Sequence, residues 1–80
     1  MMQHITVYGT EWCSDCQRSK TLLDENNILY TWIDISNQTE YRDYVKTLNN
    51  GYESVPTIVF EDGSILVEPS DKDLSIKLGI

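Results

Sequence analysis

Basic residues are few in this chain. Its 80 residues include 13 acidic and 6 basic side chains, which gives a formal net charge of −7 at pH 7. Because binding to nucleic-acid phosphates needs a cluster of Lys and Arg, and these six are scattered, we expect no nucleic-acid partner. The acidic surface is interpreted mainly as a solubility feature, although it also suits partners with basic rims.

Long apolar runs are also absent. No stretch approaches the roughly 20 apolar residues that a membrane-spanning helix needs, and the N-terminus lacks the charged, apolar and small-residue succession of a secretory signal. We therefore expect a cytoplasmic protein with no membrane partner. A chain of 80 residues with 40% hydrophobic content predicts one small domain over residues 1–80, of modest stability, and we expect it to be a monomer.

Few side chains are suited to hold a metal. The sequence has one histidine, His4, and two cysteines, whereas a structural zinc site uses about four such ligands. His4 is expected at the surface, at the start of an edge-like strand. Covalent haem attachment requires histidine directly after a Cys-x-x-Cys motif, and Gln17 stands there. We expect no metal site and no tightly bound cofactor.

The two cysteines that are present form one Cys-x-x-Cys motif in the run Trp12-Cys13-Ser14-Asp15-Cys16. In a reducing compartment such a pair is more often catalytic or metal-binding than a structural staple. Two cysteines three positions apart in the first turn of a helix can form a disulfide or stand apart as thiols. The motif therefore predicts reversible thiol–disulfide chemistry.

The apolar pattern predicts the element order β-α-β-α-β-β-α. We expect strands at residues 4–8, 28–35, 57–60 and 65–67, and helices at residues 14–27, 40–48 and 70–78. The second strand is expected to be the more deeply buried of the first two, because it is rich in β-branched and aromatic residues. This order suits an α/β fold in which a four-stranded mixed sheet is flanked by three helices. The cysteine pair then lies at the carboxyl end of the first strand, where open α/β sheets bind ligands.

The two cysteines are expected to have different roles. Cys13 lies at the helix start, where free backbone N–H groups and the helix dipole favour a thiolate, so it is the predicted nucleophile. Cys16, one turn deeper, is the predicted resolving thiol. Asp15 opposes a thiolate at Cys13, whereas Arg18 and Lys20 on the next turn favour one. We expect the helix terminus to prevail, because exposed charges are screened.

Three motifs together resemble those of the thioredoxin superfamily. They are residues 7–16 with the Cys-x-x-Cys, residues 54–63 with Val55-Pro56 before a hairpin, and Glu68-Pro69-Ser70. The short length is similar to that of glutaredoxin-like members, and the motifs look most like those of the mycoredoxins, which work with mycothiol. This resemblance spans residues 4–78. It implies a thioredoxin-like fold and a disulfide oxidoreductase that acts on protein disulfides or mixed disulfides.

The resemblance also implies residues that contact substrate. Pro56 resembles the family's cis-proline, which would present the Val55 backbone to an incoming chain. Trp12 suits two interpretations: a lid over the active site, or a loop aromatic packed on the core.

The segment before the last helix bears on the choice of thiol. Glutathione-using glutaredoxins usually carry Gly-Gly and then an acid there, whereas this chain has Glu68-Pro69-Ser70-Asp71. Pro69 lacks an N–H and Glu68 adds negative charge, so we expect a thiol other than glutathione to be favoured. The resemblance to the mycoredoxins implies that mycothiol is this low-molecular-weight thiol co-substrate. Ser70 and Asp71 either bind a sugar-like hydroxyl or simply cap the helix.

Two alternatives remain open from the sequence. Electrons could come from a thioredoxin-reductase-like flavoprotein instead of a small thiol. The chain could also be a non-catalytic iron–sulfur carrier, in which Cys13 of two copies and two external thiols hold a cluster, as among glutaredoxin relatives.

Overall fold

A computed structural model describes residues 4–80 of the chain and has the element order that the sequence predicts. The elements are β1 (Thr6–Gly9), α1 (Ser14–Glu25), β2 (Thr31–Asp34), the short 3-10 helix η1 (Ile35–Asn37), α2 (Thr39–Leu48), β3 (Thr57–Val59), β4 (Ile65–Val67) and α3 (Asp71–Leu78).

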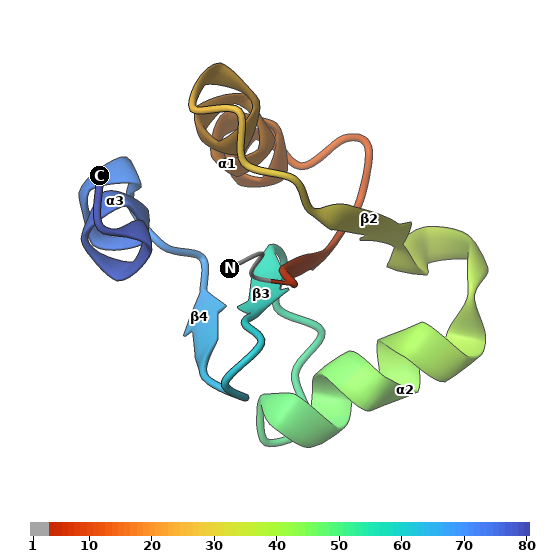
Figure 1. The fold of residues 1–80 in the computed structure, drawn as a ribbon. Coiled ribbons are helices and arrows are strands. Elements are labelled where there is room, and N and C mark those ends of the chain that lie inside the picture. The colour runs from red at the N-terminus through yellow and green to blue at the C-terminus, as the bar shows by residue number, and fades with distance from the viewer. Residues whose placement is uncertain (1–3) are drawn as a thin grey trace.

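The four strands form one mixed sheet in the order β2-β1-β3-β4. β1 pairs in parallel with β2 and antiparallel with β3, and β3 pairs antiparallel with β4. Helices α1 and α3 lie on one face of the sheet and α2 lies on the other (Figure 1). The loop that follows β1 therefore carries the chain to the start of α1 at one end of the sheet, and this loop holds Cys13.

Each face of the sheet has its own apolar layer. On the side of α1 and α3 the buried residues are Ile5, Val7, Leu23, Ile58, Phe60 and Leu74. On the side of α2 they are Tyr8, Ile35 and Val45. Both layers meet β1, so the strand that leads into the cysteine loop is held on both faces by close packing.

The expected burial of the first two strands is wrong. β1 is an inner strand and is almost wholly buried, whereas β2 is at the edge of the sheet and is exposed to half-buried. β1 pairs on both sides, while β2 has a partner on one side only. His4 is exposed as predicted, although the strand that it precedes is not an edge strand.

The second strand is also shorter than predicted, because both of its ends are used by neighbouring turns. The Ile28 N–H donates to the Leu23 carbonyl at 2.9 Å, so this part of the chain completes the end of α1. At the other end the Asp34 carboxylate accepts from the Ser36 N–H at 2.9 Å and caps η1. The Ser36 hydroxyl also donates to this carboxylate, and the hydroxyl, followed by the N–H, lowers the pKa of Asp34 from its ordinary value.

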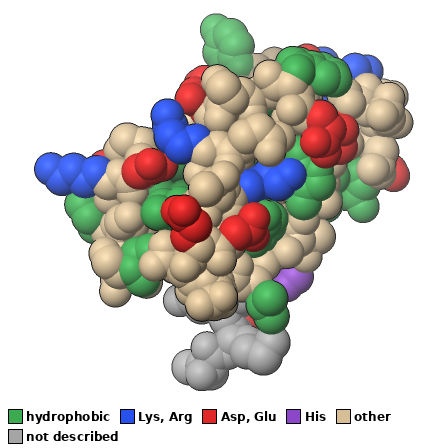
Figure 2. Space-filling view, turned by 90° about the horizontal axis from the view of Figure 1, so that it is seen from above, with side chains coloured by type: hydrophobic (Ala, Val, Ile, Leu, Met, Phe, Trp, Pro, Cys, Tyr) green, Lys and Arg blue, Asp and Glu red, His purple; other side chains and the backbone are tan. Residues whose placement is uncertain are grey.

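Charged side chains of both signs are interspersed on the face that Figure 2 shows, with hydrophobic side chains between them. Among residues 4–80, the longest helix is neither long nor apolar enough to cross a membrane.

Candidate active site

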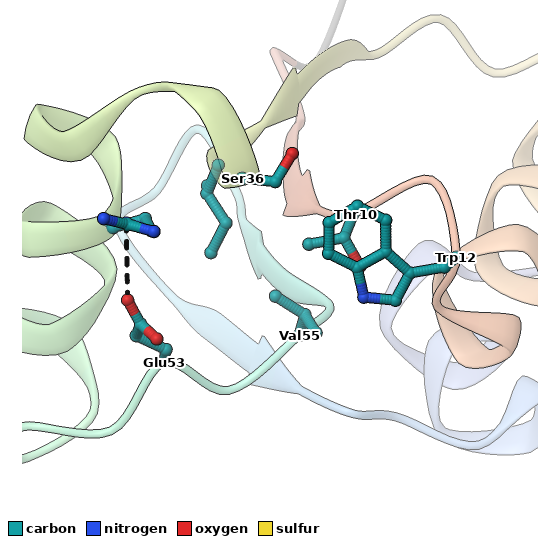
Figure 3. Close-up of a pocket in the computed structure, with 7 residues that line it drawn as sticks. Thr10, Trp12, Ser36, Glu53 and Val55 are labelled. Carbon is teal, nitrogen blue, oxygen red and sulfur yellow. Dashed lines mark ion pairs between the residues drawn. The ribbon is translucent and has the colours of Figure 1, made fainter.

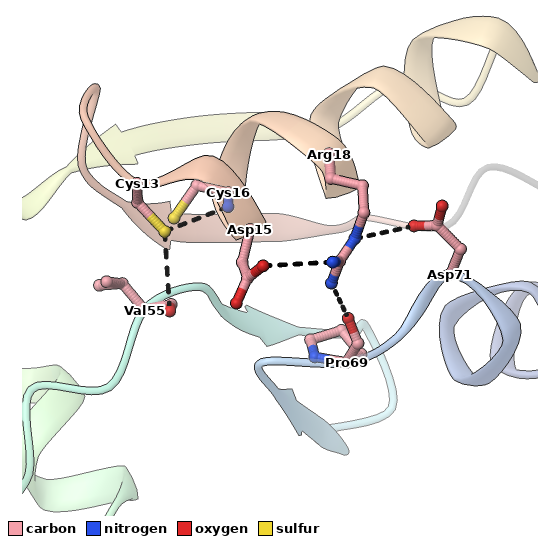
Figure 4. Close-up of polar contacts among 7 residues, drawn as sticks. All are labelled: Cys13, Asp15, Cys16, Arg18, Val55, Pro69 and Asp71. Carbon is pink, nitrogen blue, oxygen red and sulfur yellow. Dashed lines mark hydrogen bonds and ion pairs between the residues drawn. The ribbon is translucent and has the colours of Figure 1, made fainter.

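Cys13 occupies the N-cap position of α1, with an extended backbone (φ −83°, ψ 113°). Its sulfur accepts a hydrogen bond from the Cys16 N–H, with an N···S distance of 3.1 Å (Figure 4). Both cysteines are free thiols, and Cys13 is only partly buried. An N–H group and the positive end of a helix dipole thus point at an accessible sulfur, which stabilises negative charge on it.

Cys16 is in a different environment. Its side chain is 0% exposed, and this burial, followed by its hydrogen bond with Cys13, raises the pKa of Cys16 to about 12. Cys16 therefore remains a protonated thiol at neutral pH. As the sequence predicts, the two cysteines differ: the Cys13 sulfur is accessible and the Cys16 sulfur is buried.

Val55 and Pro56 reach the cysteine pair from the loop before β3. The Val55–Pro56 peptide is cis, which confirms the expected geometry, and Pro56 is buried. The Cys13 thiol lies 3.8 Å from the Val55 carbonyl oxygen, to which it donates (Figure 4). The fold thus brings together four predicted site residues from two distant parts of the chain.

The absence of a side chain at Gly9 provides the space that the buried Cys16 thiol occupies. A Cβ at Gly9 would lie 2.6 Å from the Cys16 sulfur and 2.8 Å from the Trp32 ring, so no larger side chain fits without movement. Trp32 is fixed beside this point, because its ring N–H donates to Glu11 at 3.1 Å and Lys20 lies 3.9 Å from its ring centroid. Lys20, which was expected to favour a thiolate at Cys13, thus contacts the Trp32 ring.

Arg18 connects the cysteine helix to the start of α3. It forms ion pairs with Asp15 and Asp71, each at 3.2 Å, and donates to the Pro69 carbonyl oxygen at 2.9 Å (Figure 4). Arg18 was expected to favour a thiolate at Cys13 directly, but it neutralises Asp15, the acid between the cysteines. It also holds the segment before α3 against α1.

Ser70 is the N-cap residue of α3, as its capping interpretation predicts. Its hydroxyl accepts from the Asp73 N–H at 3.1 Å. Asp71 and Asp73 lie in the first turn of this helix, where acids interact favourably with the helix dipole. The N-terminus of α3 therefore already has two carboxylates of its own beside it.

A groove of about 330 Å³ lies between Trp12, which precedes Cys13 in the chain, and Val55, and we call it the Trp12 groove (Figure 3). Its lining residues are Thr10, Trp12, Ile35, Ser36, Arg42, Glu53 and Val55. The Trp12 side chain is 75% exposed, which shows that the interpretation as a core-packed aromatic is wrong. Trp12 instead forms part of the wall of this groove.

Two charged residues of this groove were not predicted from the sequence. Arg42 of α2 and Glu53 of the loop before β3 form an ion pair at 3.5 Å (Figure 3). Glu53 also lies 3.8 Å from Lys46, one helical turn after Arg42. Arg42 is an ordinary charged residue of a helix and Glu53 one of a loop, so only the folded chain shows that they border the site.

Candidate metal ligands are not grouped in the part of the chain that the structure describes. Among residues 4–80, His, Cys, Asp and Glu side chains do not gather in sets of three or more that could hold a metal ion.

Comparison with known sequences relates this site to one family. Residues 5–65 match the glutaredoxin family. A protein of Mycobacterium tuberculosis assigned as a glutaredoxin is 40% identical over 74 residues, which cover 92% of this chain and 88% of that protein. Mycoredoxin 1 of Corynebacterium glutamicum is 31% identical over 77 residues, which cover 96% of this chain and 95% of that protein.

Comparison with solved structures agrees with the fold. A mutant of a thioredoxin-like protein matches with a TM-score of 0.80 and 28% identity, covering 92% of this chain and 97% of that one. A glutaredoxin of Archaeoglobus fulgidus matches with a TM-score of 0.80 at 19% identity, covering 92% of this chain and 84% of that one. The predicted thioredoxin-like α/β fold is therefore confirmed.

Proposed function

Since this chain belongs to the glutaredoxin family and is a thiol–disulfide oxidoreductase with a Cys-x-x-Cys pair, we propose that it reduces mixed disulfides of mycothiol. Cys13 is the nucleophile and Cys16 the resolving thiol. The observation that carries this assignment is the asymmetry of the pair: Cys13 is accessible and accepts an N–H at a helix start, whereas Cys16 is buried and protonated.

The reaction takes place in two exchanges. The Cys13 thiolate attacks one sulfur of the substrate disulfide, forms a new S–S bond to it, and releases the other half as a thiolate that takes up a proton. Cys16 then gives up its proton and attacks the Cys13 sulfur. This step releases the second half as a thiol and leaves a Cys13–Cys16 disulfide, which is reduced again by two molecules of a small thiol, themselves oxidised to a disulfide, or by two electrons from a flavoprotein reductase.

The segment before α3 supports mycothiol over glutathione. Pro69 has no N–H to offer, and its carbonyl oxygen already accepts from Arg18. Asp71 is paired with Arg18, and Glu68 adds a further acid, so a glutathione carboxylate meets negative charge here. Ser70 and Asp71 are proposed to hydrogen-bond an uncharged hydroxyl of the thiol. The relative named mycoredoxin 1 agrees with this preference.

On the other side of Cys13, Trp12, Val55 and Pro56 are proposed to contact the disulfide substrate. The Val55 carbonyl lies beside the nucleophilic sulfur, where a substrate backbone can pair with it. Trp12, largely exposed, covers bound groups from above the groove.

The test is turnover of one mixed-disulfide substrate with mycothiol, with glutathione and with a thioredoxin-reductase-like flavoprotein as electron source. We expect mycothiol-coupled turnover to exceed glutathione-coupled turnover. Cys13→Ser should abolish activity, and Cys16→Ser should trap a mixed disulfide on Cys13 that mass spectrometry detects. Glutathione turnover equal to the best alternative contradicts the mycothiol assignment, and faster turnover with the flavoprotein would make that reductase the electron source. Visible absorbance of protein purified without oxygen tests the iron–sulfur alternative.

A further inference from the structure

The Trp12 groove borders the position that a thiol bound to Cys13 would take. Val55 belongs to the groove lining, and its carbonyl oxygen is 3.8 Å from the Cys13 sulfur. The group attached to that sulfur therefore meets the groove wall. The charges on this wall decide which groups are accepted.

The two charged residues of the lining neutralise each other. Arg42 and Glu53 are 3.5 Å apart, and both side chains are about two-fifths exposed. Glu53 also lies 3.8 Å from Lys46, so its carboxylate pairs with two cations of α2, Arg42 and Lys46. A carboxylate on the bound thiol would have to compete with Glu53 for Arg42.

Uncharged polar groups do not compete with Glu53 for Arg42. Thr10 and Ser36 belong to the lining, and the Ser36 hydroxyl donates to the Asp34 carboxylate at 2.5 Å. The Thr10 hydroxyl oxygen is buried and has no hydrogen-bond partner within residues 4–80, and a buried polar group without a partner is unusual. The Ser36 hydroxyl oxygen can accept a hydrogen bond from a hydroxyl of the bound thiol, because a hydroxyl has two acceptor lone pairs.

We propose that Glu53 is a specificity-determining residue, which makes the Trp12 groove select an uncharged, hydroxyl-bearing group over a carboxylate on the thiol that reacts with Cys13. The proposal rests on the proposed function, because it needs Cys13 to react with disulfides of small thiols. It concerns a different part of the site from the segment before α3.

The experiment uses two symmetrical disulfides, in which either half can bind: bis(2-hydroxyethyl) disulfide, which is neutral, and 3,3′-dithiodipropionate, which is anionic. Each oxidises the reduced protein to the Cys13–Cys16 disulfide with release of two thiols, so no further reductant is needed. The rate is followed by tryptophan fluorescence at low ionic strength. Each rate is divided by that of the same disulfide with dithiothreitol, which removes differences in intrinsic reactivity.

We expect Glu53→Gln to raise the rate of the anionic disulfide relative to the neutral one by about threefold, a size typical of partly exposed ion pairs. Salt should reduce this gain, because it screens exposed charges. Arg42→Gln should move the same ratio in the opposite direction. Asp62→Asn is the matched control, because Asp62 also pairs with a cation, Lys77 at 3.2 Å, but lies in the turn between β3 and β4. It changes the net charge equally and should leave the ratio unchanged.

The possible outcomes separate this proposal from the proposed function. If the wild-type protein reacts with neither disulfide faster than an unfolded cysteine peptide does, the catalytic assignment fails. If both react but the ratio is the same in the wild type and Glu53→Gln, the role of Glu53 is refuted and the catalytic assignment stands. An equal increase in the Asp62→Asn variant would also refute it, because net charge alone would then explain the change.

Discussion

Iodoacetamide should modify Cys13 in the folded, reduced protein and leave Cys16 unmodified. Thiolates, not thiols, react with this reagent. Burial raises the pKa of Cys16 to about 12, compared with an ordinary value of 9.0 for a cysteine. Three pH units lower the thiolate fraction at pH 8 by about a thousandfold. The complete burial of the side chain also blocks the approach of the reagent.

The assay is timed alkylation at pH 8, followed by proteolysis and mass spectrometry. Both cysteines fall in one tryptic peptide, so fragment ions must locate the label. We expect a single label on Cys13 in buffer and labels on both cysteines in concentrated urea. Cys13→Ser should remain almost unlabelled in buffer. Labelling of Cys16 within a factor of ten of Cys13, in protein that keeps its native circular dichroism, would refute the reasoning.

The same burial predicts how stability depends on pH. In the unfolded chain the Cys16 thiol ionises near 9.0, whereas in the fold it stays protonated up to about 12. Its contribution to stability is therefore present below pH 9 and is lost as the pH rises toward 12, by at most about 1.4 kcal/mol per pH unit. Urea unfolding of the reduced protein between pH 8 and 10 should show this decrease, and Cys16→Ala should weaken it. If the unfolding free energy of Cys16→Ala falls with pH as steeply as that of the wild type, the decrease does not come from Cys16.

Three further substitutions test the packing around the site. Gly9→Ala should destabilise the protein by about 1–3 kcal/mol in urea unfolding, because the added Cβ meets the Cys16 sulfur at 2.6 Å and the Trp32 ring at 2.8 Å; an unchanged midpoint would show that both groups move freely. Arg18→Gln should cost about 1 kcal/mol and speed hydrogen exchange in α3, because the ion pair with Asp71 is lost. Ser70→Ala should cost about 1 kcal/mol through loss of the α3 cap, which thermal unfolding measures.

The sequence predicts those parts of the molecule that depend on local chemistry. The order of helices and strands follows from apolar spacing, and Cys13 and Pro56 belong to motifs with a recognisable spacing. Strand ends were less predictable, because Asp34 uses its side chain to start η1 instead of extending β2. Arg42 and Glu53 could not be found from the sequence, since each is an ordinary charged residue until the fold places them together.

The hydrogen bond from the Cys16 N–H to the Cys13 sulfur links the unfolding free energy of the protein to the reduction potential of its cysteine pair. Folding and disulfide formation make a closed thermodynamic cycle, so any free energy by which the fold favours the dithiol over the disulfide must appear as a change in reduction potential. Each 1.4 kcal/mol of such preference raises the potential by about 30 mV. The difference between the unfolding free energies of the reduced and oxidised forms therefore gives the potential of the protein relative to its own unfolded chain.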